Sequence, residues 1–131
     1  MAFTLLFDAG NKVLLARFDG TVTADVMRAM VATARRFAER EGQYPAIADF
    51  SAVEHFEIDA DSIRQFAQAR PVMAGHKRVL VAPSDAIFGS LRMFEMHQSA
   101  VGDEPVVVRS LQRAYEILEI RDPDFRPITQ P

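Results

Sequence analysis

The sequence predicts an α/β fold, with four helices packed on a mixed, mostly parallel sheet of five strands. Short apolar segments alternate along the chain with longer segments whose apolar residues recur at helical spacing. That alternation is typical of a parallel sheet covered by helices. Only a four-residue turn separates the first two apolar segments, so the first strand is expected to run antiparallel to the second.

The first part of the chain carries the hairpin and the first helix. The two strands are expected at residues 3–8 and 13–18. Thr23 is a good helix N-cap, and Gly42 ends the helix. Between these two residues an apolar stripe recurs at helical spacing: Val26, Met27, Met30, Val31, Ala34, Phe37 and Ala38. The outer face is basic (Arg28, Arg35, Arg36 and Arg40), which indicates a solvated face or, alternatively, a contact with an acidic partner.

The middle of the chain continues the alternation. Residues 45–50 have few polar side chains and predict a strand buried on both faces of the sheet. A polar turn is expected next, followed by a helix over residues 59–70 that Pro71 ends. Residues 78–82 form the clearest strand pattern. Ser84 and Asp85 then cap a third helix, which runs to about Ala100.

The last elements are short. Residues 106–108 predict a strand, and Ser110 caps a fourth helix. One face of that helix is apolar: Leu111, Ala114, Tyr115 and Leu118. Residues 121–131 contain three prolines among polar residues and predict an irregular tail. The chain is therefore expected to form one domain over residues 1–120.

Composition narrows the class of function. The chain has 131 residues, 49% of them hydrophobic, and a formal net charge of −3. No basic surface of the kind that binds nucleic acid dominates. The absence of cysteine removes disulfides and thiolate zinc sites. No apolar run approaches the ~20 residues needed to span a bilayer, and the first residues do not form a signal peptide. We expect a cytoplasmic protein.

Three segments carry a resemblance to a known family. Asp49–Val53 leads into Phe56–Ser62 at the expected passage from strand to helix. Together with the order of the elements, these residues resemble the STAS domains, which share the SpoIIAA-like fold of anti-sigma-factor antagonists. Gly20–Asp25 and Val107–Leu118 are similar to the entry to the first helix and to the last strand and helix of the stand-alone bacterial branch of that family. The resemblance spans roughly residues 3–120.

The resemblance implies a regulatory role centred on one turn. In the antagonists, an Asp-Ser-Ser-Gly turn carries the serine that a partner kinase phosphorylates. Here Asp59-Ala60-Asp61-Ser62 occupies the matching turn, so Asp61 stands where the phosphorylated serine is expected. A carboxylate there would supply a permanent negative charge at a helix N-terminus. Two alternatives remain open: Ser62 is modified if the register differs by one, or the turn is simply a helix cap.

The third helix has an unusual apolar pattern. Ile87, Leu91, Phe94 and Val101 share one face, and the opposite face is also apolar: Gly89, Met93, Met96 and Ala100. A surface helix needs only one apolar stripe. The second stripe predicts a contact with another protein, with a second copy in a homodimer, or with an apolar ligand. Alternatively, loops or the tail cover it.

Catalytic and metal sites lack support. The three histidines, His55, His76 and His97, show no metal-ligand spacing. Ser84 lacks the Gly-x-Ser-x-Gly context of a nucleophile, and a helix cap explains it better. No glycine-rich phosphate loop is present. We therefore expect no metal, no cofactor and no enzymatic activity, and we interpret the chain as a regulatory or adaptor module that binds a protein. The alternative is a carrier or sensor of a small apolar, lipid-like ligand, which the ten phenylalanines and six methionines would enclose.

Overall fold

A single mixed sheet organises the molecule. The computed structural model describes residues 2–99 and 104–128. Within them, six strands lie side by side in the order β5 (Val106–Val108), β4 (Arg78–Val81), β3 (Ala46–Glu57), β2 (Val13–Thr23), β1 (Phe3–Asp8) and β6 (Arg126–Pro127). The same residues form four helices: α1 (Ala24–Glu41), α2 (Ala60–Gln68), α3 (Asp85–Ser99) and α4 (Leu111–Leu118).

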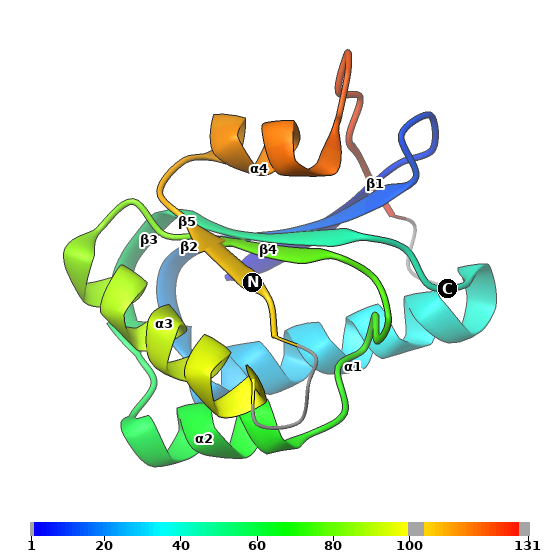
Figure 1. Cartoon of the computed structure of the whole chain (residues 1–131). Coiled ribbons are helices and arrows are strands. Elements are labelled where there is room, and N and C mark those ends of the chain that lie inside the picture. The colour runs from blue at the N-terminus through cyan, green and yellow to red at the C-terminus, as the bar shows by residue number, and fades with distance from the viewer. Residues whose placement is uncertain (1, 100–103, 129–131) are drawn as a thin grey trace.

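The helices divide unequally between the two faces of the sheet. Strands β2 to β5 run parallel, and β1 pairs antiparallel with β2. Helices α1, α2 and α3 lie on one face, and α4 lies alone on the other (Figure 1). The predicted α/β class, the four helices and the antiparallel first strand are confirmed, while the sheet has six strands rather than five.

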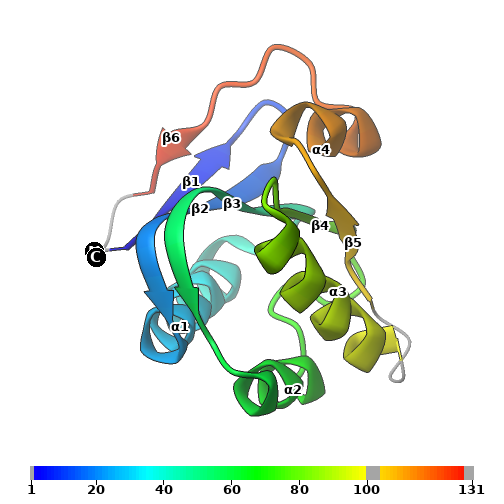
Figure 2. The same ribbon diagram turned by 90° about the vertical axis from the view of Figure 1, so that its left-hand side faces the viewer.

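Strands β2 and β3 extend beyond their predicted ends. The polar turn expected after Phe50 was wrong, because β3 continues to Glu57 and pairs in parallel with the end of β2. Main-chain pairing outweighs the polar composition, since each strand satisfies the other's backbone groups. Two register shifts interrupt this ladder, and Gly20 adopts a φ of 64° beside them. The paired ends curve together toward α1 and α2 (Figure 2).

The sixth strand comes from the tail that was expected to be irregular. Arg126 and Pro127 pair antiparallel with Phe7 and Leu6 of β1. Asp8, which is 1% exposed, holds the tail nearby by accepting a hydrogen bond from the backbone N–H of Asp124 at 2.9 Å. Residues 129–131 of the predicted tail lie outside the described residues. The short strand escapes prediction because it depends on this long-range anchor.

Two hydrophobic clusters lie on opposite faces of the sheet. The larger one packs beneath α1, α2 and α3, and within it the rings of Phe18 and Phe50 stack with centroids 4.7 Å apart. The smaller one packs beneath α4 and includes Leu15, Ile47 and Val79. Among the described residues, no helix combines the length and the apolar character needed to cross a membrane.

Candidate functional site

The turn that enters α2 is built as a helix cap. Asp59 has extended backbone geometry, and its Oδ1 accepts a hydrogen bond from the backbone N–H of Ser62 at 2.8 Å. This bond, and a second one from the Ser62 side chain, lower the pKa of Asp59, against a smaller opposing effect of burial. The capping role predicted for Asp59 is therefore confirmed. The carboxylate therefore satisfies one of the backbone N–H groups that the first turn of the helix leaves free.

The other two residues of the turn differ in exposure. Asp61 lies in the first turn of α2, its side chain is 76% exposed, and Oδ1 lies 2.6 Å from Nη2 of Arg64. Ser62 is partly buried beside Asp59. The turn therefore offers one solvent-facing carboxylate, and the hydroxyl next to it belongs to the cap.

The long pairing of β2 with β3 brings the N-termini of two helices together. Glu57 lies opposite Thr23, which is the N-cap of α1 and accepts a hydrogen bond from the backbone N–H of Val26. Acidic side chains that are all exposed gather at this end of the sheet: Asp25, Glu54, Glu57, Asp59 and Asp61. Arg28 and Arg64 pair with two of these acids, which leaves the acids in excess. We call these five residues the acidic end.

The structure only partly assembles the second apolar face predicted on α3. Gly89 and Met96 are exposed, and Met96 is the more prominent, at 68%. Met93 instead is partly buried and packs against the larger hydrophobic cluster. Ala100, like Val101 of the opposite stripe, lies outside the described residues. The helix therefore presents a narrower exposed apolar surface than the wheel predicts.

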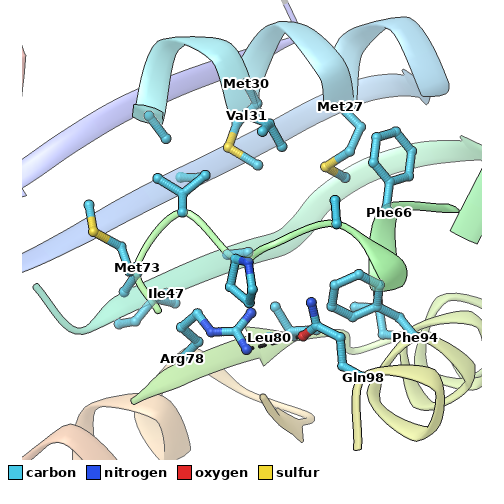
Figure 3. Close-up of a pocket in the computed structure, with 18 of the residues that line it drawn as sticks. Met27, Met30, Val31, Ile47, Phe66, Met73, Arg78, Leu80, Phe94 and Gln98 are labelled. Carbon is cyan, nitrogen blue, oxygen red and sulfur yellow. Dashed lines mark hydrogen bonds between the residues drawn. The ribbon is translucent and has the colours of Figure 1, made fainter. Parts of the chain in front are cut away.

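Beneath α2 and α3 lies an apolar pocket that residue patterns did not locate. Its volume is about 200 Å³, and it lies between the sheet and the three helices of that face. Figure 3 shows Met27, Met30 and Val31 from α1, Phe66 from α2, and Phe94 and Gln98 from α3 around it. The segment that joins α2 to β4 closes part of the wall, with Met73 anchored by the backbone N–H of Tyr44.

Small side chains explain why the space is open. Ala16 of β2 lies opposite Ala48 of β3, and Leu14 lies opposite Ala46. All four line the pocket, as does Ala34 of α1 on the facing side. Alanines on both the sheet and the helix leave a gap that larger side chains would fill. The alternation of Ala46 and Ala48 along one strand was the signal available in the sequence.

One polar pair lies at the wall of the pocket. Nη2 of Arg78 donates to Oε1 of Gln98 at 3.0 Å, as the dashed line in Figure 3 marks. Gln98 is 1% exposed although it belongs to a surface helix. A buried amide requires a hydrogen-bond partner, and Arg78 supplies one here. The bond therefore joins β4 to α3. The rest of the lining is almost entirely apolar.

Ser84 and Asp85, at the start of α3, have structural roles. Oγ of Ser84 accepts a hydrogen bond from the backbone N–H of Ile87, so Ser84 caps α3 as predicted. Asp85 instead pairs with Arg109 at 2.7 Å. Within residues 2–99 and 104–128, no three side chains of metal-binding type lie together.

The comparisons with known proteins identify the fold. A solved structure described as that of the anti-sigma factor antagonist SpoIIAA in its unphosphorylated form is similar, with a TM-score of 0.62. The match covers 90% of this chain and 98% of that chain, at 14% sequence identity. The SpoIIAA-like (STAS) fold predicted from the sequence is therefore confirmed. No protein-family model and no curated protein matches the sequence.

Proposed function

We propose that the protein is a regulatory or adaptor module that binds another protein and catalyses no reaction. The acidic end is the observation that carries this proposal, because five exposed acids gather where two helices begin. Such a surface favours a basic partner, since complementary charge speeds and orients association. The similar structure is described as that of an anti-sigma factor antagonist in its unphosphorylated form, which supports a regulatory role.

Asp61 is the residue that we assign to the switch position. Its exposed carboxylate carries a permanent negative charge, and phosphorylation of a serine would add charge of the same sign. Ser62 is less suited to phosphorylation, because its side chain hydrogen-bonds to the carboxylate of Asp59. A phosphate there would face a negative charge at close range. The turn therefore acts in one constant state, with Asp59 holding its shape.

A second contact surface is assigned to α3. Gly89 and Met96 are exposed, and the methionine side chain adapts to different surfaces. In this proposal the exposed part of α3 contacts either the same partner or a second copy of the chain. The larger contribution comes from the acidic end, since the exposed apolar part of α3 is small.

Affinity purification with matched variants tests the proposal. Asp61→Arg reverses the charge at the turn, and Glu116→Arg makes the same change on α4, where Glu116 also pairs with an arginine three residues away. We expect at least one protein, or the untagged chain itself, to be retained by the wild type and Glu116→Arg and lost with Asp61→Arg. If the two variants retain the same proteins, the acidic end is not the binding surface.

The pocket supports a second candidate function, the binding of a small apolar molecule. A pocket of about 200 Å³ with an almost wholly apolar lining exceeds the ~150 Å³ cavity that admits benzene in an engineered protein. Ile63 and Phe66 of α2 line it, so an occupant would contact the helix that Asp59 caps. Solvent extraction of the purified protein followed by mass spectrometry should recover an apolar molecule in stoichiometric amount.

A further inference from the structure

We infer that the pocket takes a single-chain amphiphile, with its apolar chain inside and a negatively charged head at the mouth. This inference rests on the second candidate function and specifies the chemistry of the ligand. Two observations carry it. The interior is almost entirely apolar, and two arginines, Arg35 and Arg70, line both the pocket and an adjoining, more open hollow.

The interior sets the nature and length of the chain. Apart from Arg35 of α1 and Gln98 of α3, the lining residues that the three helices contribute are methionine, phenylalanine and aliphatic side chains, which suit an apolar chain. A cavity of ~150 Å³ holds a ring of six carbons, so about 200 Å³ accommodates roughly eight. The flexible methionines Met27, Met30 and Met73 adjust to the shape of such a chain.

The mouth sets the charge of the head. A second, more open hollow shares Arg35, Arg70, Pro71 and Val72 with the pocket, so the two adjoin at these residues. Both arginines are exposed, and neither forms an ion pair with an acid in the described part of the chain. Glu39 also lines the outer hollow, so two positive charges face one negative charge there.

Arginine suits this position for a geometric reason. A guanidinium group presents N–H donors in a planar fork that matches a carboxylate or a phosphate. Arg78 lines the pocket as well, where it donates to Gln98. We assign the head to Arg35 and Arg70 because these two also line the outer hollow, where the head would keep contact with water.

Isothermal titration calorimetry with three eight-carbon probes tests the inference on the full chain. Octanoate, octyl phosphate and neutral octanol each contain eight carbons and differ in the head; the alkyl chain of octanoate is one carbon shorter, because its carboxyl group supplies the eighth carbon. We expect octanoate to bind about tenfold more tightly than octanol, and Arg35→Gln combined with Arg70→Gln to remove that difference. A tenfold change corresponds to about 1.4 kcal/mol. Arg36→Gln is the matched control, because Arg36 is an exposed arginine of α1 that does not line either hollow.

The outcomes separate the head from the pocket. If octanol binds but the double variant leaves the preference for octanoate unchanged, the assignment of the head is overturned and the pocket stands. If none of the three probes binds, the second candidate function fails, and the inference fails with it. Tighter binding of octyl phosphate than of octanoate would assign a phosphate ester as the head, and the reverse a carboxylic acid; either result supports an anionic head.

Discussion

The same strands form both faces of the sheet, but one face borders a pocket and the other is fully packed. Toward α1, α2 and α3, the central strands present Leu14, Ala16, Ala46, Ala48 and Leu80 around the pocket. Toward α4 they present Leu15, Ile47 and Val79, which lie in register, are at most 1% exposed and belong to the smaller cluster, although Ile47 and Val79 also border the pocket. Three helices therefore leave a space where a single helix closes its face.

The tail completes the closed face. Phe125 stacks on Tyr115 of α4 with ring centroids 6.2 Å apart, and both pack against the smaller cluster. Asn11 in the turn between β1 and β2 holds the chain after α4 by hydrogen bonds with the backbone of Arg121 in both directions. Side-chain size and long-range anchoring therefore decide whether a face is filled, and the number of covering helices does not.

The largest expected effect comes from truncating one leucine on each face. Leu14 and Leu15 are neighbours in β2, both nearly inaccessible, and their side chains belong to opposite clusters. We expect Leu15→Ala to lower the free energy of unfolding by about 4–5 kcal/mol, because it opens a new cavity in a filled layer. Leu14→Ala only enlarges an existing space and should cost about 2.5–3 kcal/mol.

Urea denaturation of both variants measures this difference. The midpoints give the stability change, provided that the slope with denaturant is the same in both variants. Equal losses, or a larger loss for Leu14→Ala, would show that the face beneath the three helices is filled at least as well as the face beneath α4.

A smaller effect is expected from the anchor of the tail. Burial raises the pKa of Asp8, but hydrogen bonds from the backbones of Asp124, Asn11 and Gly10 and from the Asn11 side chain together lower it below its ordinary value of 3.8. The ionised carboxylate of Asp8 therefore stabilises the folded state at pH values above the ordinary pKa of 3.8. This stabilisation is lost as the pH falls through the lower pKa that Asp8 has in the folded state.

Asp8→Asn isolates this contribution. We expect a loss of about 1–3 kcal/mol at pH 7, the usual cost of disturbing buried hydrogen bonds to a charged group. The difference from the wild type should shrink below about pH 4 as the carboxyl protonates. Thermal unfolding across pH 3–7 measures both, and Asp122→Asn, an exposed acid of the same tail, is the control. A difference that does not change with pH would contradict the assigned role.

The sequence was sufficient for the order and type of the elements. Periodic apolar residues located the helices, and local capping residues such as Thr23, Asp59 and Ser84 placed their starts. The ends of β2 and β3 and the strand β6 were missed because they depend on pairing between distant residues. A polar composition between residues 51 and 57 indicated a turn, and the partner strand overrode it.

Only those features of the candidate site that depend on neighbouring residues in the sequence could be predicted. The cap at Asp59 needs nothing beyond its own turn. The exposure of Met93 depends on how α3 is rotated against the core, and a helical wheel does not give that rotation. The pocket requires Ala16, Ala48 and Ala34 to face one another from three elements, which becomes visible only when the register is known.

The contrast between an open and a closed face is tested most directly by methyl NMR of the methionines. Met27, Met30 and Met73 line the pocket, while Met96 lies exposed on α3. In a chain labelled with [methyl-¹³C]methionine and titrated with octanol, the first three signals should shift in a saturable way and that of Met96 should stay in place. If the three signals do not move, or if Met96 moves with them, the face beneath the three helices holds no specific binding pocket.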